Sequence, residues 1–147
     1  LRHESLTDQL YIKVMRIRSI ERTGEARVDE GIIPEFIGLV NYAIMGQIQL
    51  ELGEADSVDL EVEDALRLYD AVAQRTFRLM MDKNHDYGEA WRSMRTTSFT
   101  DMILSKVLRT KQIEDNNGAT LVSEGIEANY MDIVNYAIFA LIRLMVE

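Results

Sequence analysis

The sequence predicts an all-α helical bundle built from a tandem duplication of a helix-loop-helix unit. Two segments recur at offsets of 93 and 94 positions, and no stretch shows the strict apolar-polar alternation of a half-buried strand. The chain has 147 residues, of which 47% are hydrophobic and 28% are charged, with a single proline. This size and composition are typical of one folded domain, so we predict a single domain over residues 1–147.

The first repeated segment occupies residues 5–21 and 98–114, and each copy predicts a helix. The two copies share Ser, Thr, Asp, Lys, Val, Arg, Ile and Glu in the same order. Ser5 and Ser98 each stand three residues before an aspartate, which is the spacing of a capping box. We therefore expect the helices to begin at these serines and to run to the glutamate that closes each segment.

The second repeated segment occupies residues 30–44 and 124–138 and predicts another pair of helices. Pro34 suits a first helical turn, so the helix of the first copy is expected from about Glu35 to Leu52. Its counterpart is expected to begin near Glu127. Both helices are apolar on nearly all sides, which predicts that they lie centrally and pack against each other about a pseudo-twofold axis.

The residues between the two copies predict a short acidic linker followed by one more helix. The linker covers residues 53–61, and the helix runs from Val62 to about Asn84. The apolar side chains expected to face the core recur at helical spacing: Leu66, Tyr69, Ala73, Phe77 and Met80. The first copy, residues 1–52, lacks this helix, whose counterpart is expected before Leu1, and the second copy covers residues 62–147.

Lys13 and Lys106 occupy matching positions in the middle of an apolar stripe on their helices. An unpaired buried ammonium is costly, so each lysine is expected to have an acidic or carbonyl partner. One interpretation is an ion pair that fixes the packing of the helices. The other is a contact to a phosphate group, in which Arg109, one turn from Lys106, takes part.

Several polar side chains share one face of the last predicted helix. They are Asn129, Asp132, Asn135 and Tyr136. Because Mg²⁺ prefers oxygen ligands, Asp132, Asn135 and the nearby Glu124 are candidate ligands of a magnesium ion. The alternative is that Asp132 pairs with Lys106. Gly38 stands where the first copy would need the aspartate, so such a site is not duplicated intact.

The stretch from Asp82 to Arg95 joins two predicted helices and combines aromatic with basic side chains. Gly88 permits a left-handed turn. Tyr87 and Trp91 are suited to stack on a nucleobase, and Arg95 is suited to hold a phosphate. The alternative is a connecting loop in which Trp91 fills the core.

Charge and cysteine content limit the partners of the chain. Sixteen lysines and arginines stand against 25 aspartates and glutamates, and the net charge of −9 disfavours duplex nucleic acid as a ligand. The chain has no cysteine, which fits a reducing cytoplasm. The longest strongly apolar run, Ile133 to Met145, is too short to span a bilayer, so no membrane association is expected.

Three strings of residues in combination resemble a known family. They are Lys83-Asn-His-Asp-Tyr-Gly-x-x-Trp91-Arg, the helix Ser-x-Thr-Asp-x-x-x-x-Lys-x-x-Arg, and the helix Glu-Gly-x-x-x-Asn-Tyr-x-Asp-x-x-Asn-Tyr. Together they are similar to the nucleotide-modification-associated domain, first of its numbered series, over almost the whole chain. The resemblance implies an all-α domain, often in tandem, of bacteria and phages.

More remotely, the chain is similar to the MazG-like all-α nucleoside triphosphate pyrophosphatases. The Mg²⁺ site of those enzymes uses Glu-Glu-x-x-Glu on one helix and Glu-x-x-Asp on another. Here Asp132-Ile-Val-Asn135 stands for the second motif in the form Asp-x-x-Asn, and the first motif has no match.

The residues and the resemblance together predict a cytoplasmic nucleotide-handling protein. One form is a Mg²⁺-dependent pyrophosphohydrolase in which a metal-activated water attacks phosphorus, and the other is a nucleotide binder that has lost this activity. No motif for covalent catalysis is present, and the catalytic residues stay unknown. The expected substrate contacts are Lys106, Arg109, Arg95, Trp91 and Tyr87. The alternative is a structural or homo-oligomerising helical module without a ligand.

Overall fold

The computed structural model describes residues 2–23, 29–52, 61–116 and 122–146, with the backbone alone for residues 29–30 and 122–124. The helices of this part are α1 (His3–Thr23), α2 (Asp29–Leu52), α3 (Val62–Tyr87), the short 3-10 helix η2 (Ala90–Ser93), α4 (Thr96–Asp115) and α5 (Val122–Met145). The described residues form no strand, so the predicted all-α class is confirmed. The predicted linker falls almost entirely outside the described residues.

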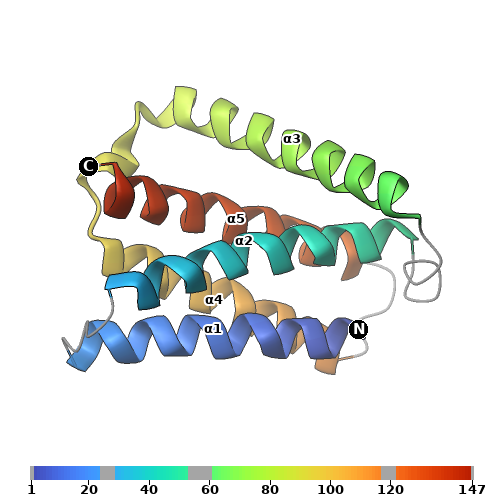
Figure 1. The fold of residues 1–147 in the computed structure, drawn as a ribbon, viewed down its shortest axis with the longest axis horizontal. Coiled ribbons are helices and arrows are strands. Elements are labelled where there is room, and N and C mark those ends of the chain that lie inside the picture. Colours follow the sequence, from blue (N-terminus) through green and yellow to red (C-terminus); the bar gives the residue numbers. More distant parts are fainter. Residues whose placement is uncertain (1, 24–28, 53–60, 117–121, 147) are drawn as a thin grey trace.

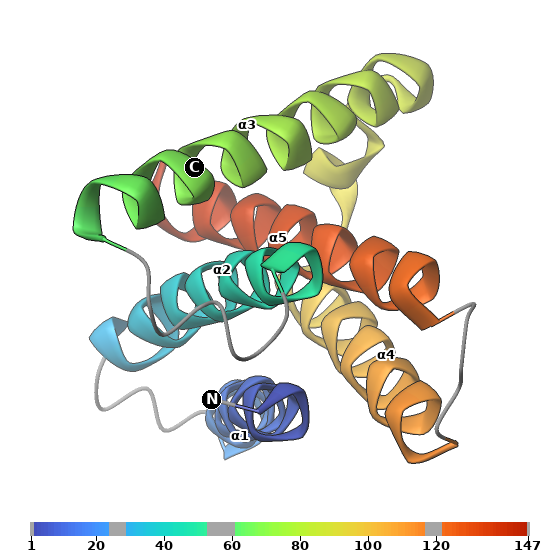
Figure 2. The same cartoon turned by 90° about the vertical axis from the view of Figure 1, so that its right-hand side faces the viewer.

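The helices lie in three layers, which Figure 1 and Figure 2 show from two sides. α2 and α5 pack against each other in the middle layer, with α1 and α4 on one side and α3 on the other. α1 packs on both α2 and α4, and α4 packs on α5. The central position predicted for the two most apolar helices is therefore confirmed.

The core lies between the middle layer and the pair formed by α1 and α4. The largest fully buried apolar side chains come from all four helices: Leu6, Leu10, Ile17, Phe36, Leu39, Phe99, Ile103, Tyr130 and Ile133. Each such side chain contributes about 1.5–3 kcal/mol by leaving water. The segment Gly31–Leu52 of α2 is long and apolar enough to cross a membrane by length and composition alone. Here the same segment supplies part of this core.

α1 and α4 begin earlier than the capping signal predicts. α4 starts at Thr96, after Arg95, whose side chain makes no capping hydrogen bond. α1 starts at His3. Ser5 and Ser98 are therefore the third residues of their helices, and the predicted starts were wrong. The first N–H groups of a helix have no intrahelical partner, so polar side chains are suited to every position of the first turn. The Ser-x-x-Asp spacing therefore does not fix the first residue of the helix.

α2 and α5 also begin earlier than predicted. α2 starts at Asp29, so Pro34 lies inside the helix and not in its first turn. α5 starts at Val122, five residues before Glu127. A proline inside a helix removes one backbone hydrogen bond. The helix continues through it because packing of the apolar face, more than local propensity, stabilises helices in proteins.

The expected core face of α3 is right at Met80, which is buried, and at Tyr69 and Ala73, which pack against the core, but wrong at its two other residues. Leu66 and Phe77 are 59% and 50% exposed, while Thr76 is almost fully buried. The Thr76 hydroxyl donates to the backbone oxygen of Val72 at 2.8 Å and accepts a hydrogen bond from the Gln47 amide of α2 at 3.3 Å. The apolar periodicity did not predict this contact, because Thr76 and Gln47 are both polar and the periodicity follows apolar side chains only.

α1 and α4 exchange matching hydrogen bonds. The Thr7 hydroxyl donates to Glu114 at 3.0 Å, and the Thr100 hydroxyl donates to Glu21 at 3.0 Å. Both the two threonines and the two glutamates stand at equivalent positions of the sequence repeat. The helices are thus antiparallel, and their reciprocal contacts are those expected of two helices related by a pseudo-twofold axis. Burial raises the pKa of Glu21, and it raises the pKa of Glu114 to about 7.

Candidate functional site

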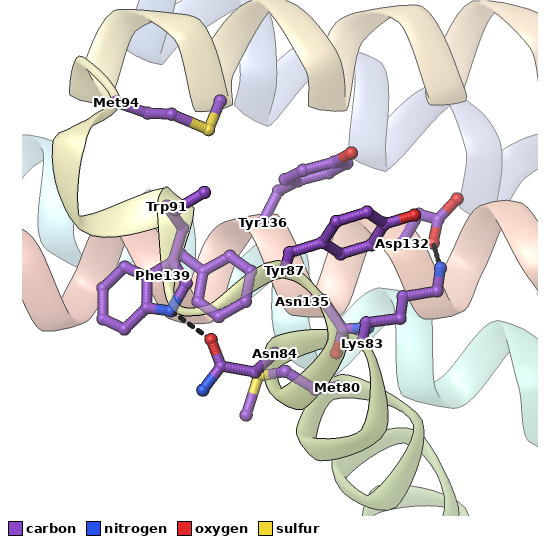
Figure 3. Close-up of a pocket in the computed structure, with 11 residues that line it drawn as sticks. Met80, Lys83, Asn84, Tyr87, Trp91, Met94, Asp132, Asn135, Tyr136 and Phe139 are labelled. Atoms are coloured by element: carbon purple, nitrogen blue, oxygen red, sulfur yellow. Dashed lines mark hydrogen bonds and ion pairs between the residues drawn. The ribbon is translucent and has the colours of Figure 1, made fainter.

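A pocket of about 310 Å³ lies where α3, η2 and α5 meet (Figure 3). Its wall is mostly apolar and aromatic with a few polar groups: Met80, Lys83, Asn84, Tyr87, Ala90, Trp91, Met94, Asp132, Asn135, Tyr136 and Phe139. This volume lies at the small end of ligand pockets, and the mixture of an apolar wall with a few polar groups is typical of them. The pocket is therefore the candidate binding site.

A left-handed turn between α3 and η2 builds one wall of the pocket. Gly88 and Glu89 have φ angles of 62° and 59°. Glycine adopts this conformation without strain, whereas a glutamate does so rarely. The Glu89 carboxylate accepts a hydrogen bond from the Arg92 guanidinium at 3.0 Å, which ties the turn together. The turn ends α3 and leads the chain into η2, which packs on α5.

Trp91 is part of the pocket wall and does not offer a face to a ligand. Its ring stacks on Phe139 with 4.7 Å between centroids and an interplanar angle of 9°. The Arg92 guanidinium carbon lies 4.5 Å from the indole centroid, and the indole N–H donates to Asn84 Oδ1 at 2.8 Å. Both faces are covered and the residue is only 8% exposed. Trp91 therefore fills the core, and stacking of a base on it is excluded in this arrangement.

Asp132 stands at the edge of the pocket between two lysines. Its Oδ1 accepts a hydrogen bond from Lys83 Nζ at 3.0 Å, and its Oδ2 lies 3.1 Å from Lys106 Nζ. In the first copy, Lys13 Nζ lies 3.3 Å from a Glu35 oxygen. The prediction that both repeat lysines have acidic partners is confirmed.

The expected Mg²⁺ site is not assembled by the side chains that the structure describes. Each oxygen of Asp132 is already paired with an ammonium group, and the two positive charges disfavour a cation beside the carboxylate. Within the described ranges, no three His, Cys, Asp or Glu side chains gather in a way that suits a metal. The side chain of Glu124, another expected ligand, lies outside the described part. The donor groups of the described residues therefore do not form a site suited to a divalent cation.

Asn135 lines the pocket and is only 5% exposed. Its Oδ1 is buried and has no hydrogen-bond partner among the residues that the structure describes. A buried amide oxygen without a partner costs free energy unless something else satisfies it. Tyr136 follows it on α5, and Tyr87, 73% exposed, stands at the open side of the pocket. These groups, unlike Trp91, remain available to a ligand.

Two of the expected substrate contacts lie away from this pocket. Arg95 is exposed just before α4 and is not among the lining residues. Arg109 donates to Gln112 at 3.0 Å and lines a separate groove between α1 and α4. Lys106 meets the pocket only through its ion pair with Asp132. The expected residues that do line the pocket are Tyr87, Trp91, Asp132 and Asn135.

Sequence reasoning identified Tyr87 but missed the other residues that α3 contributes to the site. Lys83 and Asn84 lie in the last turns of α3 and face the pocket in Figure 3. They belong to the string from Lys83 to Arg92, so their position just before the left-handed turn at Gly88 was a usable signal. Met80, Met94 and Phe139 gave no such signal, because apolar residues in a helix do not indicate which neighbour they will meet.

Comparison with known proteins assigns the chain to a family. The family model described as nucleotide modification associated domain 1 matches residues 1–50 and 83–144, which is most of the chain. Every pocket-lining residue except Met80 falls within these ranges. No curated protein and no solved structure gives a match. The chain belongs to the nucleotide modification associated domain 1 family.

Proposed function

We propose that this domain binds a nucleotide in the pocket between α3, η2 and α5. The observation that carries the proposal is Asn135, which lines a largely apolar pocket and whose buried Oδ1 has no partner within the described part of the chain. Because this oxygen gives up no hydrogen bond, the amide is free to turn and to present either its oxygen or its NH₂ group. An amide of this kind suits the edge of a nucleobase, which carries both donors and acceptors.

The aromatic residues support the same assignment. Tyr136 lines the pocket beside Asn135, and the exposed Tyr87 stands where a ring can close over a bound base. Stacking on an aromatic side chain contributes about 1–3 kcal/mol per base. We therefore assign the base to the space between these tyrosines, with Asn84 as a further polar contact.

The phosphate group is assigned to the lysines at the pocket edge. Lys83 and Lys106 share the single carboxylate of Asp132, so this cluster carries one positive charge in excess. The side chains of Lys83 and Lys106 are 49% and 34% exposed, which leaves their ammonium groups within reach of a solvent-side phosphate. A phosphate held in this way needs no metal ion. We accordingly propose binding, and not Mg²⁺-dependent hydrolysis, as the activity of this pocket.

Calorimetry and thermal unfolding test the proposal. Nucleosides, nucleoside monophosphates and triphosphates are each titrated with and without Mg²⁺. A ligand at a hundred times its Kd stabilises the folded state by about 2.7 kcal/mol. We expect nucleotides to stabilise the chain without Mg²⁺ and nucleosides to do so less. Stabilisation that requires Mg²⁺ would instead favour the pyrophosphohydrolase, and no stabilisation by any nucleotide would contradict the proposal.

The repeat offers a matched control for this experiment. Asn41 of α2 stands at the position equivalent to Asn135, but its Oδ1 accepts a hydrogen bond from the Tyr69 hydroxyl at 2.7 Å. Asn135→Ala should weaken nucleotide binding by about tenfold, the loss of one good hydrogen bond. Asn41→Ala should leave the affinity unchanged. Equal effects of the two substitutions would mean that Asn135 does not contact the ligand.

A separate observation favours an oligomerising module as a second function. Leu66, Phe77 and Met81 of α3 are 59%, 50% and 53% exposed. Exposed apolar side chains on one helix are typical of an interface, and a second copy of this chain fits a self-complementary face. Sedimentation velocity of the wild-type chain and of the double variant Leu66→Ser/Phe77→Ser tests it. A monomer at all concentrations would remove this candidate.

A further inference from the structure

An open groove runs between α1 and α4. These two helices lie on the opposite side of α2 and α5 from α3 (Figure 1, Figure 2). The volume of the groove is about 700 Å³. Arg18 of α1 and Arg109 of α4 line it together with Ser105, and Leu104 and Leu108 form its apolar part. The groove shares no lining residue with the pocket on α3 and α5.

Among the residues that the structure describes, no acidic side chain pairs with the two guanidinium groups of the groove. Arg109 donates a single hydrogen bond, to the Gln112 side chain at 3.0 Å. Arg18 is half-buried and has no hydrogen bond or ion pair within the part of the chain that is described. Asp101 also lines the groove, but it forms no ion pair with either arginine among the described residues. Two planar donor sets from different helices are therefore left for an anion.

In the other half of the repeat, the equivalent arginine is paired with an acid. Arg16 is the counterpart of Arg109, and its guanidinium lies 2.9 Å from a Glu35 carboxylate oxygen. Glu35 corresponds to Asn129, whose amide donates to Thr110 and carries no charge. The replacement of this acid by an amide leaves Arg109 without the partner that Arg16 has.

A second difference between the halves concerns the side chain that stands beside the basic residue. Tyr11 is the counterpart of Leu104, and Lys111 is the counterpart of Arg18. In the first half, the Lys111 ammonium lies 5.8 Å from the Tyr11 ring centroid, so each covers part of the other. In the second half Leu104 offers no aromatic ring to the Arg18 guanidinium. Leu108, 47% exposed, extends this apolar patch.

The geometry points to a binding site for a phosphate monoester whose organic part is apolar. The two guanidinium forks and the Ser105 hydroxyl take the phosphate, and Leu104 and Leu108 take the organic group. A phosphate dianion matches two arginines better than a carboxylate does, because it has two charges and three terminal oxygens. This site is independent of the nucleotide pocket.

Phenyl phosphate, inorganic phosphate and benzoate are the probes of the test. Each is titrated into the isotope-labelled chain near neutral pH, and the side-chain N–H resonances of the arginines are followed by NMR. We expect phenyl phosphate to shift the Arg18 and Arg109 signals saturably, with inorganic phosphate about fivefold weaker because it lacks the apolar contact. Benzoate should bind more weakly than phenyl phosphate. No saturable shift with phenyl phosphate, or tighter binding of benzoate, would overturn the assignment.

Variants taken from the other half of the repeat serve as controls. Arg109→Gln should weaken phenyl phosphate binding by about tenfold, whereas Arg16→Gln should not change it. Leu104→Tyr installs the residue of the first half and should also block binding without removing a charge. Melting curves by circular dichroism establish that each variant is folded. Unchanged affinity in both Arg109→Gln and Leu104→Tyr would overturn the site.

Discussion

The two halves of the repeat solve the same problem, a lysine in an apolar stripe, in different ways. In the first half, Lys13 passes across Gly38 to reach Glu35, and a Cβ at Gly38 would stand 2.7 Å from Lys13 Cε. In the second half, Asp132 occupies the position of Gly38, and Lys106 pairs with it directly. The ion pair has thus moved by one helical turn between the halves.

This shift has a consequence for the surface of the bundle. Glu35 is deeply placed, with 11% of its side chain exposed, and serves Lys13 and Arg16 of its own half. Asp132 lies nearer to the surface, under α3, and also binds Lys83. Both halves keep the lysine, but its acidic partner stands at a different position in each. As a result, only the second half has a charged cluster beside a pocket.

The largest expected effect comes from a packing difference between the halves. Gly46 of α2 lies against the ring of Tyr130, and a Cβ there would stand 2.6 Å from Tyr130 Cζ. The equivalent residue of α5 is Ala140. Gly46→Ala should lower the free energy of unfolding by roughly 2–3 kcal/mol, because a buried ring cannot move aside without loss. Urea unfolding measures it.

Gly125 provides the control for this prediction. A Cβ at Gly125 would lie 3.3 Å from Ile113 Cδ1, the end of a flexible side chain. Gly125→Ala should leave stability unchanged or raise it by up to about 1 kcal/mol through helix propensity. Similar losses in both variants would mean that Gly46 is not specifically required by Tyr130.

The next effect compares the two acids. Glu35→Gln should lower the free energy of unfolding by roughly 2 kcal/mol, because it leaves Lys13, only 23% exposed, with an uncharged partner. Asp132→Asn should lower it by about 1 kcal/mol, since its lysines are 34% and 49% exposed. Urea unfolding at low and high salt checks both values.

The Asp132→Asn variant also separates function from scaffold. If the lysine cluster holds phosphate, removing the carboxylate charge should leave nucleotide binding intact or tighter while stability falls slightly. If Asp132 instead holds Mg²⁺, the same substitution should abolish Mg²⁺-dependent binding. A larger loss of stability in Asp132→Asn than in Glu35→Gln would contradict the burial argument.

A smaller effect concerns the pH dependence of stability. Burial raises the pKa of Glu114 to about 7, although the Thr7 hydrogen bond lowers it in part, and nearby Glu4, Asp8 and Asp115 raise it further. The folded chain thus holds this proton more tightly than the unfolded chain. Stability should fall as pH rises from about 4.5 to about 7 and stay lower above that.

Replacing Glu114 removes this dependence. Glu114→Gln should be more stable than wild type at alkaline pH by about 1 kcal/mol, a value reduced for the partial exposure of the carboxyl group. The advantage should shrink as the pH falls below about 4.5, where the wild-type carboxyl becomes protonated in both states. Thermal unfolding across this pH range measures the change, and a constant difference at all pH values would refute the assignment to Glu114.

The sequence by itself determined the helices, their order and the needs of particular side chains. The apolar stretches of α2 and α5 required a central position, and the stripes around Lys13 and Lys106 required acidic partners, because burial of apolar area and of charge carries a cost that any fold must meet. The repeat likewise indicated two equivalent halves. These features follow from the spacing of apolar side chains along single segments, so each of them is visible without knowledge of the contacts between segments.

Tertiary structure alone decided which groups meet. Lys83 and Lys106 converge on Asp132 because α3, α4 and α5 come together there, and no spacing along the chain encodes that convergence. Trp91 became a core residue because Phe139 and Arg92 cover its two faces. Arg109 was separated from Lys106 because one turn along a helix advances a side chain by about 5 Å while also rotating it toward a different neighbour. Contacts between helices depend on their relative rotation, which the apolar pattern leaves open within tens of degrees.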